Sequence, residues 1–282
     1  MKTVLLPTDF SKNAWNAIFT ALKLFRNIQC KFVLFHTYEP ELTNIMGDKG
    51  ERRLGVIYRS MEEESRKQMD EILKYLKEHH QNPRHEFKVL IRPGDLIREV
   101  RERIKTHPVD LIVMGTQGAT GAERVLLGSN TVRMLKNISN RPVLAVPETY
   151  DFQRLDHVIF PTDYTRYYEP YELQLLLDLL KVWKSTLHVA YAAQEFKLKP
   201  VQESNKELLK TRLKDVKVRF EEVSLKHNLS ETIGDFSDSV GADMIALMQH
   251  KHSFLENLTR EKVVKRIAFD SKLPLLILPQ FL

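Results

Sequence analysis

The chain contains one pattern twice, and this internal repeat limits what it can fold into more than any other feature. A hydrophobic run, an identical Pro-Thr-Asp, an aromatic residue and a hydroxyl residue read KTVLLPTDFS at residues 2–11 and DHVIFPTDYT at residues 156–165, an offset of 154. The same offset aligns residues 31–39 with 185–193 without a gap, which predicts matching lengths of strand, helix and second strand in both halves. Two further pairs of runs agree: VDLIVMG (109–115) with ADMIALM (242–248), and RPVLAVP (141–147) with LPLLILP (273–279). A long unit that occurs twice indicates a domain duplication rather than a solenoid.

The duplication divides the 282 residues into two expected domains, 1–149 and 155–282. Each has an ordinary size for a domain. The boundary falls between about 148 and 155, in a short segment without a clear hydrophobic period. Because so short a linker leaves little room for independent motion, we expect the two domains to pack closely.

Short apolar runs alternate with amphipathic stretches in the first half. The runs lie at 3–6, 31–36, 87–91, 110–114 and 143–146. Five strands that alternate with helices predict an open parallel five-stranded sheet with helices on both faces, a doubly wound α/β fold.

Helix boundaries can be predicted from the same segments. Ser11 predicts the N-cap of a helix that extends to about Phe25, and residues from about 51 to 80 predict a second helix. The turn Pro93-Gly94-Asp95 places Asp95 where it can cap the third helix.

Four of the ten glycines lie within fourteen positions after the fourth apolar run. Gly115, Gly118, Gly128 and Ser129 form the spacing G-x2-G-x9-G-S. Backbone N–H groups of a glycine-rich turn can bind phosphate oxygens, and a helix N-terminus adds partial positive charge. The hydroxyls of Ser129 and Thr131 can donate to the same oxygens. Because ligands of open parallel sheets bind at the carboxyl ends of the strands, the pattern favours a phosphate site; the alternative is that the glycines serve only turns and close packing.

The other wall of this crevice is expected directly after the first strand, at Pro7, Thr8 and Asp9. An ionised Asp9 only accepts hydrogen bonds, so it suits a ribose hydroxyl or an adenine amino group; the alternative is that it only caps the following helix. Thr37, near the end of the second strand, can offer backbone contacts to a base, whereas His36 is expected to be packed rather than catalytic.

Composition excludes some function classes. The net charge of +6 permits an acidic partner, but basic and acidic residues are interspersed, so we expect no nucleic acid. The single Cys30 cannot form an internal disulfide and is expected to be buried at the start of a strand, in a reducing compartment. Pro7 and Asp9 end the first apolar run too early for a secretion signal, and no run reaches the roughly 18 apolar residues of a membrane span. We therefore expect a cytoplasmic protein that spans no membrane.

These segments together resemble the universal stress protein family: VLLPTDFS, FHTYE, VDLIVMGTQGATGAERVLLGSNTVRML and RPVLAVP. The resemblance covers both halves, although the nucleotide motif is complete only in the first. It implies a Rossmann-like fold of the adenine nucleotide alpha hydrolase-like type that binds ATP, with ADP or AMP as alternatives and Mg²⁺ as a companion of the phosphates. The ATP-binding members carry G-x2-G-x9-G-[ST], and the four motif residues above match it position by position.

The resemblance also implies what each residue does. Asp9 contacts the base and the ribose, Met114 and Thr37 line the adenine site, and Asn130 and Thr131 add phosphate contacts. The full set expected at the nucleotide is Pro7, Thr8, Asp9, Thr37, Met114, Gly115, Thr116, Gly118, Gly128, Ser129, Asn130 and Thr131. The family pairs two domains through their final strands, which here implies an internal pseudo-dimer joined by VLAVP and LLILP and leaves a further homodimer open. Such pairing protects apolar edge strands.

The second half departs from the pattern after Met248. Arg260 and Glu261 fall where the first half has Gly128 and Ser129, and every motif glycine is absent. A carboxylate at a helix N-terminus repels a phosphate, so we expect no ATP site there and interpret Asp163 as a helix cap. His250 and His252 have no Cys or carboxylate companions, which favours a solvated loop over a metal site and leaves a different acidic ligand open.

The sequence leaves three functions open. We favour a nucleotide-responsive stress module whose changed surface is read by an unidentified protein partner. The alternatives are an enzyme of slow ATP hydrolysis or adenylyl transfer, and a scaffold that binds no ligand. The chain has no G-x-x-x-x-G-K-[ST] loop, and the spacing supports neither a Ser-His-Asp set nor paired carboxylates, so we name no catalytic residue.

Overall fold

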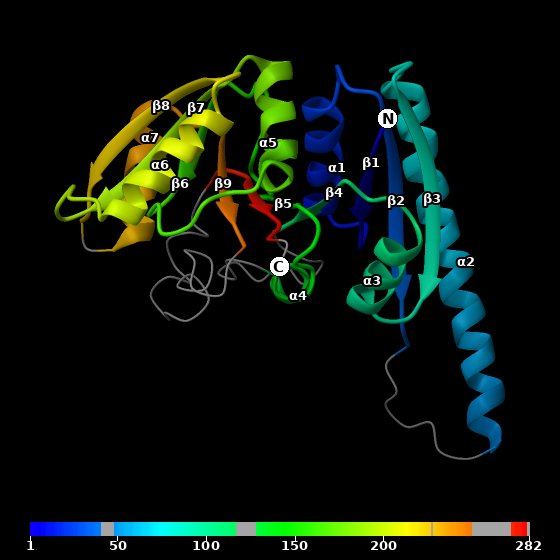
Figure 1. The fold of residues 1–282 in the computed structure, drawn as a ribbon. Helices are drawn as coiled ribbons and strands as arrows, with labels where there is room; N and C mark the ends of the chain where they lie inside the picture. Colours follow the sequence, from blue (N-terminus) through cyan, green and yellow to red (C-terminus); the bar gives the residue numbers. More distant parts are fainter. Residues whose placement is uncertain (41–47, 117–127, 227, 250–271, 281–282) are drawn as a thin grey trace.

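The computed structural model describes residues 1–40, 48–116, 128–226, 228–249 and 272–280. They form one open ten-stranded sheet in the order β3-β2-β1-β4-β5-β10-β9-β6-β7-β8 (Figure 1). The strands are β1 (Lys2–Pro7), β2 (Cys30–Tyr38), β3 (His85–Pro93), β4 (Leu111–Gly115), β5 (Val143–Val146), β6 (His157–Pro161), β7 (Thr186–Ala193), β8 (Lys217–Ser224), β9 (Met244–Met248) and β10 (Leu275–Leu278). The helices are α1 (Lys12–Leu24), α2 (Asp48–His79), α3 (Leu96–Thr106), α4 (Ser129–Asn137), α5 (Pro170–Trp183), α6 (Pro200–Arg212) and α7 (Leu229–Val240).

Each half contributes five parallel strands in the same order. The first half runs β3-β2-β1-β4-β5, and the second half, from its outer edge, runs β8-β7-β6-β9-β10. In each half the chain first adds strands on one side of its first strand and then crosses to the other side. Strand β4 lies on the opposite side of β1 from β2, and β9 lies on the opposite side of β6 from β7. This arrangement confirms the predicted doubly wound fold, in which ligands commonly bind beside the carboxyl ends of the strands at the switch point, here β1 and β4.

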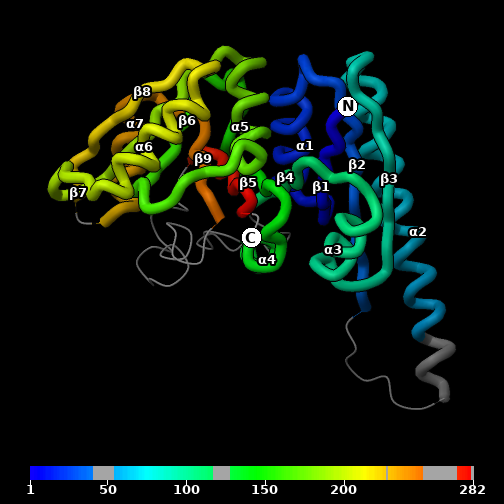
Figure 2. Tube along the Cα trace, in the orientation of Figure 1, coloured from blue at the N-terminus to red at the C-terminus, as the bar shows by residue number. Residues whose placement is uncertain are grey.

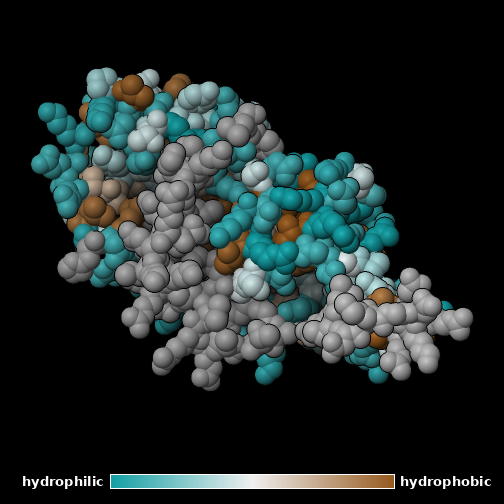
Figure 3. Space-filling model, turned by 90° about the horizontal axis from the view of Figure 1, so that it is seen from below, coloured by the Kyte–Doolittle hydropathy of each residue, from teal (hydrophilic) through white to brown (hydrophobic). Residues whose placement is uncertain are grey.

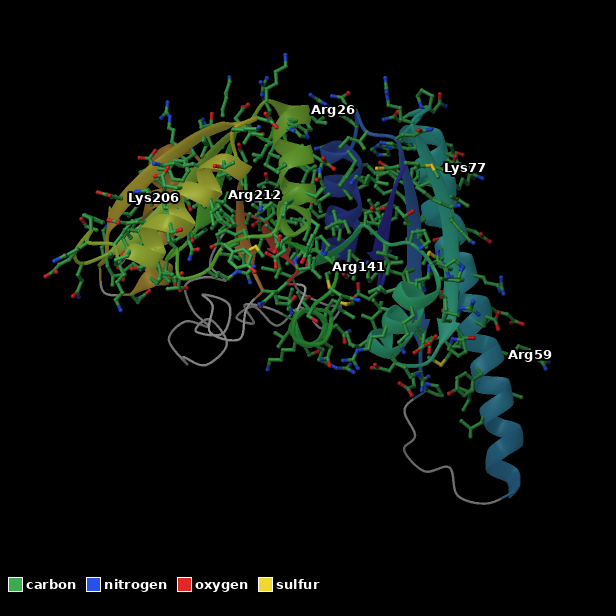
Figure 4. All side chains as sticks on the ribbon, viewed as in Figure 1. Arg26, Arg59, Lys77, Arg141, Lys206 and Arg212 are labelled. Atoms are coloured by element: carbon green, nitrogen blue, oxygen red, sulfur yellow. The ribbon has the colours of Figure 1, made fainter. Side chains whose placement is uncertain are left out.

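The halves join through an antiparallel pair of their final strands, which we call the seam. Leu144 of β5 lies opposite Leu276 of β10, the pairing of final strands that the family resemblance implies. Beside the seam, α1 and α5 lie next to each other (Figure 2). The Trp183 indole donates to the Leu24 carbonyl at 2.9 Å, and the Arg26 guanidinium lies 4.4 Å from the centre of that indole ring (Figure 4). Polar and apolar contacts therefore both connect the halves.

The segment between the halves is part of the core rather than a free linker. Phe152 and Leu155 are fully buried, and the Phe152 ring lies 5.3 Å from Trp183. Close packing of the halves was predicted, but these two anchors were not, because two apolar residues in a short segment show no period.

Two cores cover the two faces of the sheet. One contains side chains of α1, α2, α5 and α6, and the other contains side chains of α3, α4 and α7. Cys30 begins β2 and is buried as predicted, and burial raises the pKa of its thiol to about 12. The predicted caps are also present: Ser11 Oγ accepts the Ala14 N–H at 3.2 Å, and Asp95 accepts the N–H of Ile97 and of Arg98 at 3.1 Å each. Within the described ranges, none of the helices combines the length and the apolar character that a membrane span requires.

The predicted equal spacing of the two halves is wrong by one residue. Val4 pairs with Phe32, whereas the corresponding Val158 pairs with Leu187, one position later than a gapless alignment requires. The loop before α5 also differs from the loop before α1, since Tyr168 is buried there and its hydroxyl lies 2.6 Å from Thr162 Oγ1. This inserted packing delays the start of the helix.

Asp163 is not the helix cap that we expected. Its carboxylate accepts the Thr165 N–H at 2.9 Å, while α5 begins only at Pro170 after the N-cap residue Glu169. The inserted loop moves the helix start out of reach of Asp163. The Glu169 N–H is instead bound by the Glu172 carboxylate at 3.0 Å.

A chain of titratable side chains crosses three strands of the second half. His157 Nδ1 lies 3.1 Å from His188 Nε2, and His188 Nδ1 lies 3.4 Å from a Glu221 oxygen. Burial lowers the pKa of His188, and the neighbouring His157 also lowers it, against the opposing effect of Glu221. A histidine with a depressed folded pKa contributes stability above its unfolded pKa of about 6.5 and loses that contribution as the pH falls below it.

We therefore expect the free energy of unfolding to fall as the pH is lowered from neutral through about 6.5, and to fall less steeply in a His188→Gln variant. Urea unfolding at a series of pH values measures both slopes. The other histidines with lowered pKa values, among them His36 and His85, keep the slope of the variant above zero. Identical slopes in the two proteins would contradict the assignment of this dependence to His188.

Candidate functional site

A cavity of about 140 Å³ opens at the carboxyl ends of β1, β2 and β4, beside the first turn of α4. The carboxyl ends of these strands point down in Figure 1, and Figure 3 views the molecule from below. On this side of the first half, hydrophilic side chains surround a few hydrophobic ones. The residues that line the cavity are Pro7, Thr8, Asp9, Ala14, His36, Thr37, Leu96, Met114, Gly115, Gly128, Ser129, Asn130 and Thr131.

Most residues predicted for a nucleotide site line this one cavity. Of the predicted set, Thr116 is buried just beyond the lining, and Gly118 lies outside the described residues. Sequence reasoning missed Ala14 and Leu96. A signal existed for Leu96, since the cap at Asp95 begins α3 at the same edge of the sheet where β1 and β4 end.

The wall after β1 is held by its own side chains. Thr8 Oγ1 accepts the Phe10 N–H at 3.0 Å, and Asp9 Oδ1 accepts the Ser11 N–H at 3.1 Å. Phe10 takes the left-handed conformation with φ 65°, which is unusual for a bulky residue and marks a locally strained turn. Asp9 itself is exposed at the mouth of the turn, and Ser11 rather than Asp9 caps α1.

The same turn occurs in the second half. Tyr164 has φ 55°, and its N–H is accepted by Thr162 Oγ1 at 3.0 Å. Because the turn persists where the glycine motif is lost, its strain belongs to the architecture of the fold. It is not by itself evidence for a nucleotide.

The opposite wall is the N-terminus of α4. Gly128 is the N-cap, and its carbonyl accepts the Val132 N–H at 3.0 Å. The N–H groups of Ser129, Asn130 and Thr131 belong to the first turn, so no carbonyl of the helix can accept them. They provide donors and partial positive charge at the cavity, the requirement for binding an anion.

One predicted hydroxyl contact does not fit this geometry. Thr131 is buried, and its Oγ1 donates to the Gly115 carbonyl at 2.8 Å, so its hydroxyl proton holds α4 against the end of β4. A phosphate contact by Thr131 would have to come from its backbone N–H. Ser129, in contrast, is exposed.

Gly115 has a packing role. A Cβ added at this position would lie 2.2 Å from Asn13 Oδ1, and Asn13 Nδ2 donates to the Val146 carbonyl at 3.1 Å. Helix α1 therefore approaches the end of β4 too closely for a side chain. At Gly115, the packing alternative considered for the motif glycines holds.

The charge inside the cavity is set by few groups. His36 Nδ1 lies 2.7 Å from the Thr8 carbonyl, which can only accept, so Nδ1 carries the ring proton. Burial lowers the pKa of His36 despite this bond and the nearby Asp9, and its ring lies 4.5 Å from Phe10. His36 is thus packed as predicted. Among the described lining residues Asp9 is the one carboxylate, and none is Lys or Arg.

An ion pair beside the cavity ties α3 to α4. Arg133 of α4 donates to Asp95 at 2.6 Å. Partial burial raises the pKa of Asp95, but the Arg133 guanidinium and the N–H groups at the start of α3 outweigh burial and lower it. The pair helps to fix the direction of the α4 N-terminus.

The corresponding segment of the second half is not described. The predicted differences at His250, His252, Arg260 and Glu261 lie outside the described residues. Within the part of the chain that the structure describes, no group of three His, Cys, Asp or Glu residues is placed to hold a metal ion.

Comparison with known proteins agrees with this fold and sequence. The model of the universal stress protein family matches residues 1–147. Two universal stress proteins of Methanocaldococcus jannaschii are 30% identical over 145 residues and 31% identical over 154; each match covers 51% of this chain, and 81% and 94% of the relatives. The structure of a universal stress protein from Archaeoglobus fulgidus has a TM-score of 0.73 and 16% identity and covers 99% of this chain and 98% of its own, a likeness in fold. The chain belongs to the universal stress protein family.

Proposed function

We propose that the first half binds an adenine nucleotide, preferentially ATP, and that the chain acts as a nucleotide-responsive regulatory module. The observation that carries the proposal is the convergence of three strand ends and the α4 N-terminus on one cavity. Helix amides that have no acceptor within α4 face the position of an anion on one wall, and an acceptor-only carboxylate lies on the other. This division suits a ligand with phosphate at one end and hydroxyl or amino donors at the other.

Each wall has its part in the proposed complex. The amides of Ser129 and Asn130 bind phosphate oxygens, Asp9 binds the ribose or the base, and Met114 with Thr37 contacts adenine. The cavity is smaller than the roughly 300–1,000 Å³ of a typical ligand pocket, so part of the nucleotide extends outside it. Mg²⁺ commonly keeps waters and substrate phosphates as ligands. Because Asp9 is the one carboxylate in the described lining, we propose that Mg²⁺ arrives with the phosphates.

The same lining favours binding over turnover. Phosphoryl transfer needs cationic groups or metal at the transferred phosphate and a group that orients the attacking water. The described lining offers no Lys or Arg and a single carboxylate. We therefore propose a binding module rather than an ATPase. Phosphate release in the presence of Mg²⁺ at a rate that Asp9→Ala abolishes would select the enzyme instead.

An Asp9→Ala variant tests the assignment of the two walls. We expect it to weaken adenosine and ATP alike, by about 10-fold, because the lost charge-assisted hydrogen bond belongs to the part that both ligands share. Titration of each ligand into each protein measures the effect. Wild-type affinity for both ligands in this variant would show that Asp9 only shapes its turn.

A further inference from the structure

The described stretch 228–249 of the second half ends at a residue whose side chain reaches into the first half. Gln249 follows β9, and its Nε2 donates to the carbonyl of Leu135 in α4 at 2.5 Å. Leu135 lies in the last turn of α4, where the backbone carbonyls find no N–H donor within the helix. Gln249 therefore caps the C-terminus of α4 from across the seam.

Gln249 occupies the same position in the second half as Thr116 does in the first. Its backbone N–H donates to Leu278 of β10 at 2.9 Å, and in the first half the N–H of Thr116 donates to Val146 of β5 at the same distance. Gln249 is thus the counterpart of Thr116, the residue from which the glycine segment of the first half continues. In the second half, the corresponding residue after β9 is Gln249, and its side chain binds the first half at Leu135.

Among the described residues, few side-chain contacts from outside fix helix α4, and they act on its first turn, its middle and its last turn. Thr131 holds the first turn to β4, and Arg133 holds the middle to Asp95. At the last turn, Arg101 donates to the Asn137 carbonyl at 3.3 Å beside the contact from Gln249. Because a helix of nine residues moves as a unit, loosening its C-terminus changes the direction of its N-terminal amides.

We infer that Gln249 is a positioning residue for the site of the first half: the half that lost its phosphate motif supports α4, and so increases the nucleotide affinity of the other half. The expected effect of Gln249 on ATP affinity rests on the proposed function. The contact itself can be tested without nucleotide.

The test compares three substitutions at one position with a matched control. Gln249→Glu keeps the shape but replaces the donor with an acceptor, Gln249→Ala removes the side chain, and Gln249→Lys restores a donor. The control is Tyr150→Phe, which removes the 3.0 Å bond from the Tyr150 hydroxyl to the Asp243 carbonyl, a bond between the connecting segment and the second half that does not touch α4. Hydrogen exchange of the α4 amides without nucleotide and the ATP dissociation constant are measured for each protein.

We expect Gln249→Ala to raise the ATP dissociation constant about 3- to 10-fold, the range that the loss of one hydrogen bond sets. Gln249→Glu should raise it by at least as much. Both variants should exchange faster across α4, Gln249→Lys should recover slow exchange, and Tyr150→Phe should change neither measurement at α4. Unchanged α4 exchange in Gln249→Glu, or the same change in Tyr150→Phe, would overturn the inference. If the intact chain binds no ATP, the proposed function fails, while the exchange result still decides whether Gln249 fixes α4.

Discussion

A Ser129→Glu variant should lose at least about 100-fold in ATP affinity while its fold is as stable as that of the intact chain or slightly more stable. Ser129 is the first residue of α4 and is exposed at the cavity, so a longer side chain there can extend away from the packed part of the described structure. A carboxylate in the first turn favours the helix, by typically 0.3–1 kcal/mol, because it opposes the partial positive charge there. It also stands about where the phosphates are proposed to bind, and two like charges about 4 Å apart near a protein surface repel by roughly 4 kcal/mol.

The matched control places the same charge at the other end of the same helix. Ser139→Glu adds one carboxylate at an exposed position after α4, so it should leave ATP affinity near that of the intact chain. Titration and urea unfolding of both variants separate local repulsion from loss of structure. Equal affinity losses in the two variants would show that net charge, not the α4 N-terminus, controls binding.

Gly115→Ala should destabilise the fold by about 2–4 kcal/mol, a second large effect with a different cause. The added Cβ would lie 2.2 Å from Asn13 Oδ1 and 3.1 Å from the Asn13 backbone carbon. To avoid this contact, Asn13 must give up its bond to the Val146 carbonyl and α1 must shift, which combines the cost of overpacking with that of an unmade buried hydrogen bond. Urea unfolding measures the loss.

A double-mutant cycle tests whether the destabilisation by Gly115→Ala comes from this clash with Asn13. Removing the Asn13 side chain makes room for the Cβ, so Asn13→Ala and Gly115→Ala together should cost less than the sum of their separate effects. Gly234→Ala is the control, because a Cβ there meets no described atom within 4 Å; it should stabilise α7 by roughly 0.5–1 kcal/mol. Additive losses at Asn13 and Gly115 would show that the two residues do not compete for space.

Much of this fold could be predicted from the residues, because the decisive signals were local or repeated. Apolar runs marked the strands of the first half, and Ser11 and Asp95 marked helix starts through the short range of their cap bonds. The pairing of β5 with β10 followed from the family resemblance and the apolar character of both ends. Each of these predictions depends on neighbouring residues or on the comparison of the two halves.

The rest depended on contacts between residues far apart in the sequence. The one-residue change in register of β7 comes with the burial of Tyr168 in a loop, and no alignment of the two halves alone shows which side chain will be buried. Phe152 and Leu155 are anchors whose segment is too short to show a period. The roles of Gly115 and Gln249 are set by partners about one hundred residues away, Asn13 and Leu135.

Binding of one adenine nucleotide at the cavity of the first half is the property on which the proposed function depends. Calorimetric titration of ATP with Mg²⁺ into the intact chain, repeated with Ser129→Glu, tests it most directly. We predict saturable binding of one nucleotide per chain and no measurable binding to the variant. Failure of the intact chain to bind ATP, or equal binding by the variant, would contradict the proposed function and would leave the glycine segment with a purely architectural role.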